Sequence, residues 1–95
     1  MNTDDQTKLA RSIGRDVAHE KALSTYIGSP RRNEPAAMVD LLKMNFEMGR
    51  TQLQGRLVEA NLPADLYRTA EDEFRKVKDA VLDGVRNGKY QVPAR

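Results

Sequence analysis

The sequence predicts an all-α fold of three helices, in which a long antiparallel hairpin of the second and third helices packs against the first. Apolar residues recur every three or four positions in three segments, proline-containing breaks separate these segments, and no segment alternates apolar and polar residues as a strand does. A chain of 95 residues suits a single domain. We expect this domain to span residues 1–88 and an extended tail to span 89–95.

The first helix is predicted over residues 3–27. Thr3 and Gln6 have the spacing of a capping box, in which each side chain satisfies a backbone N–H of the first turn. The apolar stripe of this helix begins with Leu9, Ile13 and Val17. Gly28-Ser29-Pro30 follows and predicts the end of the helix.

The second helix is predicted from Asn33, as N-cap, to about Ala60, because proline at position 35 is tolerated in a first turn. It carries two apolar stripes. The main stripe is Met38, Leu42, Phe46 (or Asn45), Gly49, Leu53 and Leu57, and the second is Ala37, Leu41, Met44 and Met48. Two stripes predict that the first half of this helix is covered on two sides.

A tight connection, Asn61-Leu62-Pro63, predicts that the second and third helices are antiparallel neighbours. Asn61 suits the left-handed position that ends a helix, and Pro63 suits the first position of the next one. The third helix is predicted from a stripe with regular spacing, and Asn87-Gly88 ends it. The stripe is Leu66, Tyr67, Ala70, Phe74, Val77, Val81 and Val85.

Composition excludes several classes of protein. The chain has no cysteine, so it has no disulfide framework and no thiol chemistry, and a reducing compartment is favoured. Sixteen basic and fourteen acidic residues give a net charge of only +2, which permits a nucleic-acid partner without requiring one. No apolar run reaches the length of a membrane span, and the polar, acidic first residues do not resemble a signal peptide. We therefore expect a cytoplasmic protein without membrane contact.

Motifs for catalysis and cofactor binding are missing. No glycine-rich phosphate loop or calcium loop occurs, and His19-Glu20 lacks the second histidine that a zinc motif needs. His19 is also the only candidate base, and no serine has the right placement beside it. We expect a protein that is not an enzyme and that binds no metal or cofactor.

Two groups of basic residues are candidates for partner binding. Arg11 and Arg15 share one face of the first helix with Lys8 and His19, and Arg31 and Arg32 lie in the following loop. Such residues can meet phosphates or an acidic protein surface. The alternative is a solvated helix face, in which Asp16 and Glu20 offset the charge, followed by an ordinary polar loop.

Methionines supply the main candidate for an apolar binding surface. Met38, Met44 and Met48 lie close together on the second helix with Leu41 and Phe46, and methionine adapts its shape to different partners. Burial of these residues under the first helix is an equally good interpretation. The sequence thus predicts a small regulatory or adaptor protein that binds another protein of unknown identity and forms a homodimer. The alternatives are a nucleic-acid accessory protein that uses Arg11, Arg15, Arg31, Arg32 and the tail, or a structural subunit.

Overall fold

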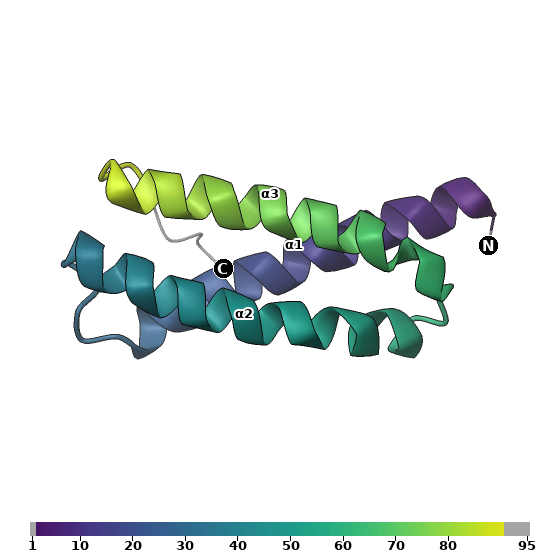
Figure 1. The fold of residues 1–95 in the computed structure, drawn as a ribbon, viewed down its shortest axis with the longest axis horizontal. Coiled ribbons are helices and arrows are strands. Elements are labelled where there is room, and N and C mark those ends of the chain that lie inside the picture. Colours follow the sequence, from purple (N-terminus) through teal and green to yellow (C-terminus); the bar gives the residue numbers. More distant parts are fainter. Residues whose placement is uncertain (1, 91–95) are drawn as a thin grey trace.

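The computed structural model describes residues 2–90, and within them it confirms the predicted all-α fold (Figure 1). Three long helices form most of this region: α1 (Thr3–Gly28), α2 (Pro35–Glu59) and α3 (Tyr67–Arg86). A single turn of 3₁₀ helix, η1 (Ala64–Leu66), precedes α3.

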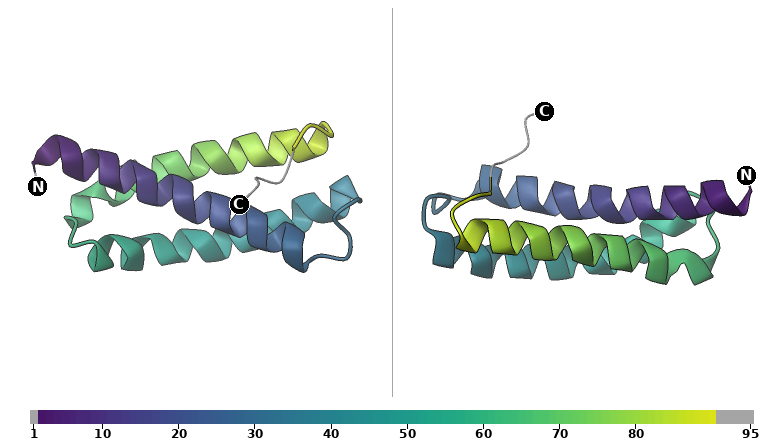
Figure 2. Two further views of the ribbon diagram at one scale, coloured as in Figure 1. Left: turned by 180° about the vertical axis from the view of Figure 1, so that it is seen from behind. Right: turned by 90° about the horizontal axis from the view of Figure 1, so that it is seen from above.

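The three helices form an elongated bundle of about 44 × 23 × 20 Å. Helices α2 and α3 run in opposite directions, as predicted, and α1 packs against both of them (Figures 1 and 2). The contacts of α1 give its direction: Arg15 meets Glu73 and Tyr26 meets Tyr90, so α1 is parallel to α3. The structure therefore settles the placement of α1, which the sequence had left undetermined.

The start of α1 differs by one residue from the predicted cap. Asn2, rather than Thr3, is the N-cap, and its side-chain oxygen accepts a hydrogen bond of 2.8 Å from the backbone N–H of Asp5. Thr3 is the first helical residue, and its carbonyl accepts a bond from the hydroxyl of Thr7. Asparagine is as good an N-cap as serine or threonine. Asn2 and Thr3 were therefore both plausible N-caps, and the sequence alone did not decide between them.

The start of α2 also differs from the prediction. Glu34 is the N-cap, and its side chain makes no capping hydrogen bond, whereas Asn33 lies in the preceding turn. Pro35 occupies the first turn, as predicted. A proline there fixes the backbone for helix and removes one N–H that would need a partner, which lowers the need for a side-chain cap.

The ends of α2 and α3 use the predicted residues. Asn61 (φ 57°) and Gly88 (φ 68°) adopt the left-handed conformation just after each helix. The N–H groups of Leu62 and Lys89 then reach back to carbonyls of the last turn, at 3.0 and 2.7 Å, which satisfies groups that the helix end leaves unpaired. Pro63 was predicted to be the first helical residue. It instead precedes η1 as its N-cap.

The core lies along the axis between the three helices. The main stripe of α2 is buried as predicted, with Phe46 rather than Asn45 in the stripe. The rings of Phe46 and Phe74 meet edge to face, with centroids 5.9 Å apart, which is a favoured aromatic geometry. The buried side of α1 is rich in small residues, and a Cβ on Gly14 would overlap the backbone of Ala70. Helices α1 and α3 are thus in direct backbone contact.

The chain after α3 folds back toward α1. Tyr90 packs on Tyr26, with ring centroids 5.3 Å apart, and lies against Gly84. Residues 91–95 of the predicted tail lie outside the described residues. Within the described part of the chain, no helix has the length and apolarity to traverse a lipid bilayer.

Candidate protein-binding surface

A face rich in apolar and small residues runs along the side of α2 that points away from the other two helices, with the exposed residues Asp40 and Glu47 beside it. Its residues recur every three or four positions, and we call them the α2 outer face: Ala37, Leu41, Met44, Met48, Thr51, Gly55 and Val58. The three large side chains that project farthest are Met44, Met48 and Val58, which are 65%, 56% and 67% exposed. Ala37 and Leu41 are half-buried, and Leu41 packs against the edge of the core.

The prediction that the first half of α2 is covered on two sides is wrong. Helices α1 and α3 both contact the opposite side of α2, where Met38 and Phe46 are buried, so the prediction that these two residues belong to the binding surface is wrong and they belong to the core. In a bundle of three helices, each helix has two neighbours, and these cover one side of it. Burial of Met44 and Met48 under α1, the competing interpretation, is therefore wrong as well.

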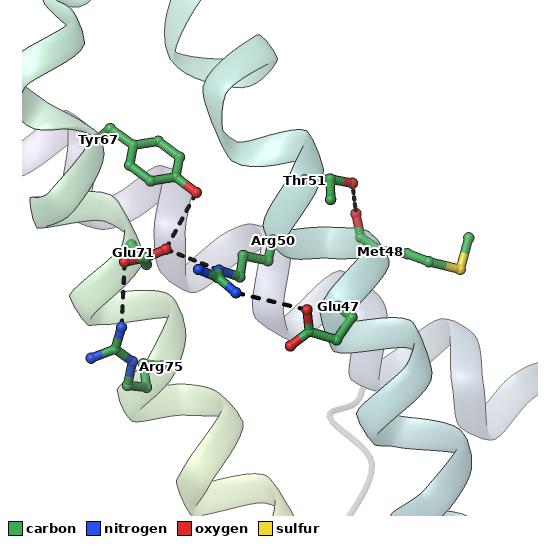
Figure 3. A network of polar contacts seen from close by, with 7 residues as sticks. All are labelled: Glu47, Met48, Arg50, Thr51, Tyr67, Glu71 and Arg75. Carbon is green, nitrogen blue, oxygen red and sulfur yellow. Dashed lines mark hydrogen bonds and ion pairs between the residues drawn. The ribbon is translucent and has the colours of Figure 1, made fainter.

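The α2 outer face extends beyond the residues that the sequence singled out. Thr51, Gly55 and Val58 continue the spacing of Leu41, Met44 and Met48 for two more turns. Threonine and glycine are not counted as apolar residues. The predicted stripe therefore ended at Met48. The hydroxyl of Thr51 donates to the carbonyl of Met48 at 2.7 Å, so this polar group is satisfied within the helix (Figure 3).

Shallow depressions lie at both ends of the α2 outer face. One, of about 300 Å³, lies beside Val58 where the chain turns toward α3. The other, of about 240 Å³, lies between Leu41 and the end of α1. Thr25 and Asn45 form the wall of the second depression and are hydrogen-bonded to each other. The face therefore has hollows into which side chains of a partner can insert.

Arg11 and Arg15 lie elsewhere, on the seam between α1 and α3. Arg15 forms an ion pair of 3.8 Å with Glu73, and Arg11 lines a polar depression together with Asp72 and Glu73. His19 is exposed on α1. Acidic side chains of α3 thus offset the predicted basic face, which favours a structural role for its arginines.

Arg31 and Arg32 lie in the turn that connects α1 to α2, and both are exposed. The backbone N–H of Arg31 donates to the hydroxyl of Ser29, which orders the turn. Arg32 borders a small hollow of about 130 Å³ that Tyr26 and Tyr90 also line. The structure therefore does not join the predicted binding residues into one site: Leu41, Met44 and Met48 share a face, and the two arginine pairs lie apart from each other on the seam and in the turn.

A polar network on the flank of α2 fixes its position against α3 (Figure 3). Arg50 donates to Glu71 at 3.0 Å and also lies 3.8 Å from Glu47. Glu71, which is largely buried, accepts further bonds from Tyr67 and Arg75. The hydrogen bond from Arg50 holds the pKa of Glu71 below its ordinary value, against the opposing effect of desolvation. Met48 points away from this network, so the polar flank and the apolar face are separate.

Two further observations concern the ionisable side chains of the described residues. Residues 2–90 hold no group of three or more side chains that could bind a metal ion. Burial raises the pKa of Tyr90, whose hydroxyl has no hydrogen-bond partner among the described residues. Because Tyr90 stacks on Tyr26, we assign it to the packing of the chain end rather than to a site.

Comparisons with protein-family models, with curated proteins and with solved structures find no match for this chain.

Proposed function

We propose that this chain is a small, non-enzymatic regulatory or adaptor protein that acts by binding another protein through the α2 outer face, and that it also self-associates. One observation carries the proposal: the large apolar side chains of Met44, Met48 and Val58 lie on one side of α2 and are 65%, 56% and 67% exposed. Exposed apolar side chains that gather on one face are typical of protein-binding surfaces.

The chemistry of the face fits a protein partner. Met44 and Met48 provide flexible, polarisable contact area, which suits binding to an apolar groove or to the apolar side of another helix. The exposed Arg31 and Arg32 would supply charge complementarity at one end of the bundle. A cytoplasmic location, favoured by the absence of cysteine, is part of the same proposal.

The nucleic-acid alternative has weaker support. Phosphate binding needs a field of uncompensated positive charge, whereas Arg15 is paired with Glu73 and Arg11 lies beside Asp72. Titration with mixed DNA and RNA in about 20 mM salt tests this alternative, since phosphate contacts are strongest at low salt. Tight binding that weakens steeply with salt would favour it over protein binding.

A comparison of two variants tests the proposed function. Met44→Asp combined with Met48→Asp puts two charges on the α2 outer face, whereas Ala80→Asp puts a charge on the exposed side of α3. Tagged wild-type and variant proteins are used for affinity capture from a lysate of the organism that makes the chain, with quantitative mass spectrometry. We expect the double variant to lose the captured partner at least tenfold and the Ala80 variant to retain it.

Circular dichroism of both variants completes this test. We expect both to keep the helical spectrum and the melting temperature of the wild type, because the substituted residues are exposed. Unfolding of the double variant would show that Met44 and Met48 belong to the core. Equal capture by all three proteins would exclude the α2 outer face as the binding surface.

A further inference from the structure

The short segment of residues 88–90 crosses from the end of α3 to the side of α1 (Figure 2). The backbone N–H groups of Lys89 and Tyr90 both donate to the carbonyl of Gly84, at 2.7 and 3.0 Å. Beyond these bonds the Tyr90 ring packs on Tyr26 in the last turns of α1, with centroids 5.3 Å apart. We call residues 88–90 the strap, because they join the end of α1 to the end of α3.

Gly84 shapes α3 to receive the strap. It lies inside α3, where an alanine would favour the helix more. A Cβ built on Gly84 would lie 3.2 Å from the Cβ of Tyr90 and 3.4 Å from its Cα, and the three nearest atoms that it would meet all belong to Tyr90. The missing side chain therefore provides the space in which Tyr90 lies.

The hydroxyl of Tyr90 opposes the closed position of the strap. This oxygen is buried and has no hydrogen-bond partner among the described residues. In water the same hydroxyl makes hydrogen bonds, so closing the strap removes them without replacing them. The ring contact with Tyr26 and the two backbone bonds to Gly84 favour closure, and the hydroxyl counteracts them.

The strap can open without disturbing the rest of the bundle. Lys89 is exposed and Tyr90 is only half-buried, whereas the core residues Phe46 and Phe74 pack on each other away from the strap. Chain ends that are held by few contacts open with a lower free energy than the whole fold.

Opening would change the surface at one end of the bundle. Tyr90 lines a hollow of about 130 Å³ together with Tyr26, Val85 and Arg32. When the strap is open, the Tyr26 ring loses the ring that packs on it and becomes accessible beside Arg32. An apolar and aromatic surface next to an exposed cation then replaces a covered one.

We propose that residues 88–90 form a reversible strap, which is held closed by Gly84 and Tyr26, is weakened by its own unpaired hydroxyl, and exposes Tyr26 beside Arg32 when it opens while the three helices stay folded. This inference goes beyond the proposed function. It concerns a different surface from the α2 outer face, so either proposal can fail without the other.

Hydrogen exchange of the full chain, followed by NMR, tests whether the strap is reversible. The amides of Lys89 and Tyr90 are protected by Gly84 only when the strap is closed. We expect the Tyr90 amide to exchange at least about a hundredfold faster than that of Phe74, but at least about fivefold slower than in an unfolded peptide of the same sequence. Equal rates at Tyr90 and Phe74 would show that the strap opens only when the chain unfolds. An unprotected Tyr90 amide would show that the strap is not closed. Either result would overturn the inference.

Tyr90→Phe tests the role of the hydroxyl, because it keeps the ring and removes the unpaired group. We expect exchange of the amide at position 90 to slow by about tenfold. Tyr67→Phe is the matched control: its hydroxyl donates to Glu71 at 3.3 Å, away from the strap, so exchange at position 90 should stay unchanged. Unchanged or faster exchange in Tyr90→Phe would contradict the inference.

Gly84→Leu tests the exposure of Tyr26, because the leucine side chain takes the space of Tyr90 while favouring the helix. Acetylation by N-acetylimidazole, mapped by mass spectrometry, measures the reactivity of Tyr26. We expect it to rise at least about fivefold, with an unchanged helical circular dichroism spectrum. Gly55→Leu makes the same substitution inside α2, where a Cβ meets nothing within 4 Å, and should leave the reactivity of Tyr26 unchanged.

Tyr90→Ala keeps the inference testable if Gly84→Leu perturbs α3. It leaves the helix intact and removes the ring that packs on Tyr26. The reactivity of Tyr26 should rise in this variant as well. Wild-type reactivity of Tyr26 in a folded Tyr90→Ala protein would overturn the inference, because the strap would then not cover Tyr26.

Discussion

Helices α2 and α3 lie side by side in one bundle, yet they present different faces to solvent. The exposed positions of α3 are charged except for Ala80, and ion pairs run along and between the helices there. The exposed positions of α2 include charged residues too, but also the large apolar residues Met44, Met48 and Val58. Both helices bury residues along one side, so the difference lies in their exposed residues.

This contrast separates two reasons for an apolar residue in a helix. On α3, apolar residues lie where the bundle covers them, which is the pattern of a helix with one buried stripe. On α2 a second stripe exists that the bundle leaves exposed. The proposed function rests on this second stripe.

The largest expected effect concerns the two sides of α2. Leu42 is fully buried, whereas Met44 is 65% exposed. Leu42→Ala should lower the free energy of unfolding by about 2–5 kcal/mol, because it leaves a cavity in the core. Met44→Ala should change it by less than about 0.5 kcal/mol. Urea denaturation measures both. Similar losses in the two variants would abolish the contrast between the two sides.

A smaller effect distinguishes the α1–α3 seam from the α2 outer face. Gly14→Ala should destabilise the protein by about 1–3 kcal/mol, since its Cβ overlaps the Ala70 backbone and the helices must move apart. Gly55→Ala should stabilise the monomer by about 1 kcal/mol, because alanine favours helix and the site is open. Thermal unfolding of dilute protein shows whether each variant is more or less stable than the wild type. Destabilisation by Gly55→Ala would mean that Gly55 has a role inside the chain.

The smallest effect concerns the charged network between α2 and α3. The folded-state pKa of Glu71 lies below the ordinary 4.5, so its ionised form contributes stability above pH 4.5 that is lost as pH falls through the folded pKa. Glu71→Gln should therefore be less stable than the wild type at pH 7, and the difference should shrink below pH 4.5. Unfolding by urea at several pH values measures it.

Glu59→Gln is the matched control for this measurement, since the described residues offer Glu59 no ion-pair partner. Its stability should follow the wild-type pH profile. A constant difference between wild type and Glu71→Gln from pH 7 to pH 3 would show that Glu71 acts through packing and not through its charge.

Local features of the fold were predictable from the sequence. The inner stripe of α2 follows from helical periodicity, and Asn61 and Gly88 were identified because few residues tolerate positive φ. The N-caps were harder, because Asn2 and Thr3 are both good capping residues and Pro35 makes a cap on Asn33 unnecessary. In each case the error was a single residue.

The candidate site was less predictable, because it depends on where helices lie in space. Periodicity places Met44 and Met48 on one side of α2, but only the position of α1 decides whether that side is covered. The partner of Arg15 is Glu73, 58 positions away in the sequence, and no local pattern links them.

The parallel arrangement of α1 and α3 has a consequence for the order in which the molecule assembles. Contacts between these helices join residues far apart in the chain, such as Gly14 and Ala70, whereas α2 and α3 are joined by a short turn. Closing the longer loop has the larger entropic penalty, so the α2–α3 hairpin should form early in folding and α1 should dock late. Substitutions in the seam should then mainly accelerate unfolding, and leave the folding rate nearly unchanged.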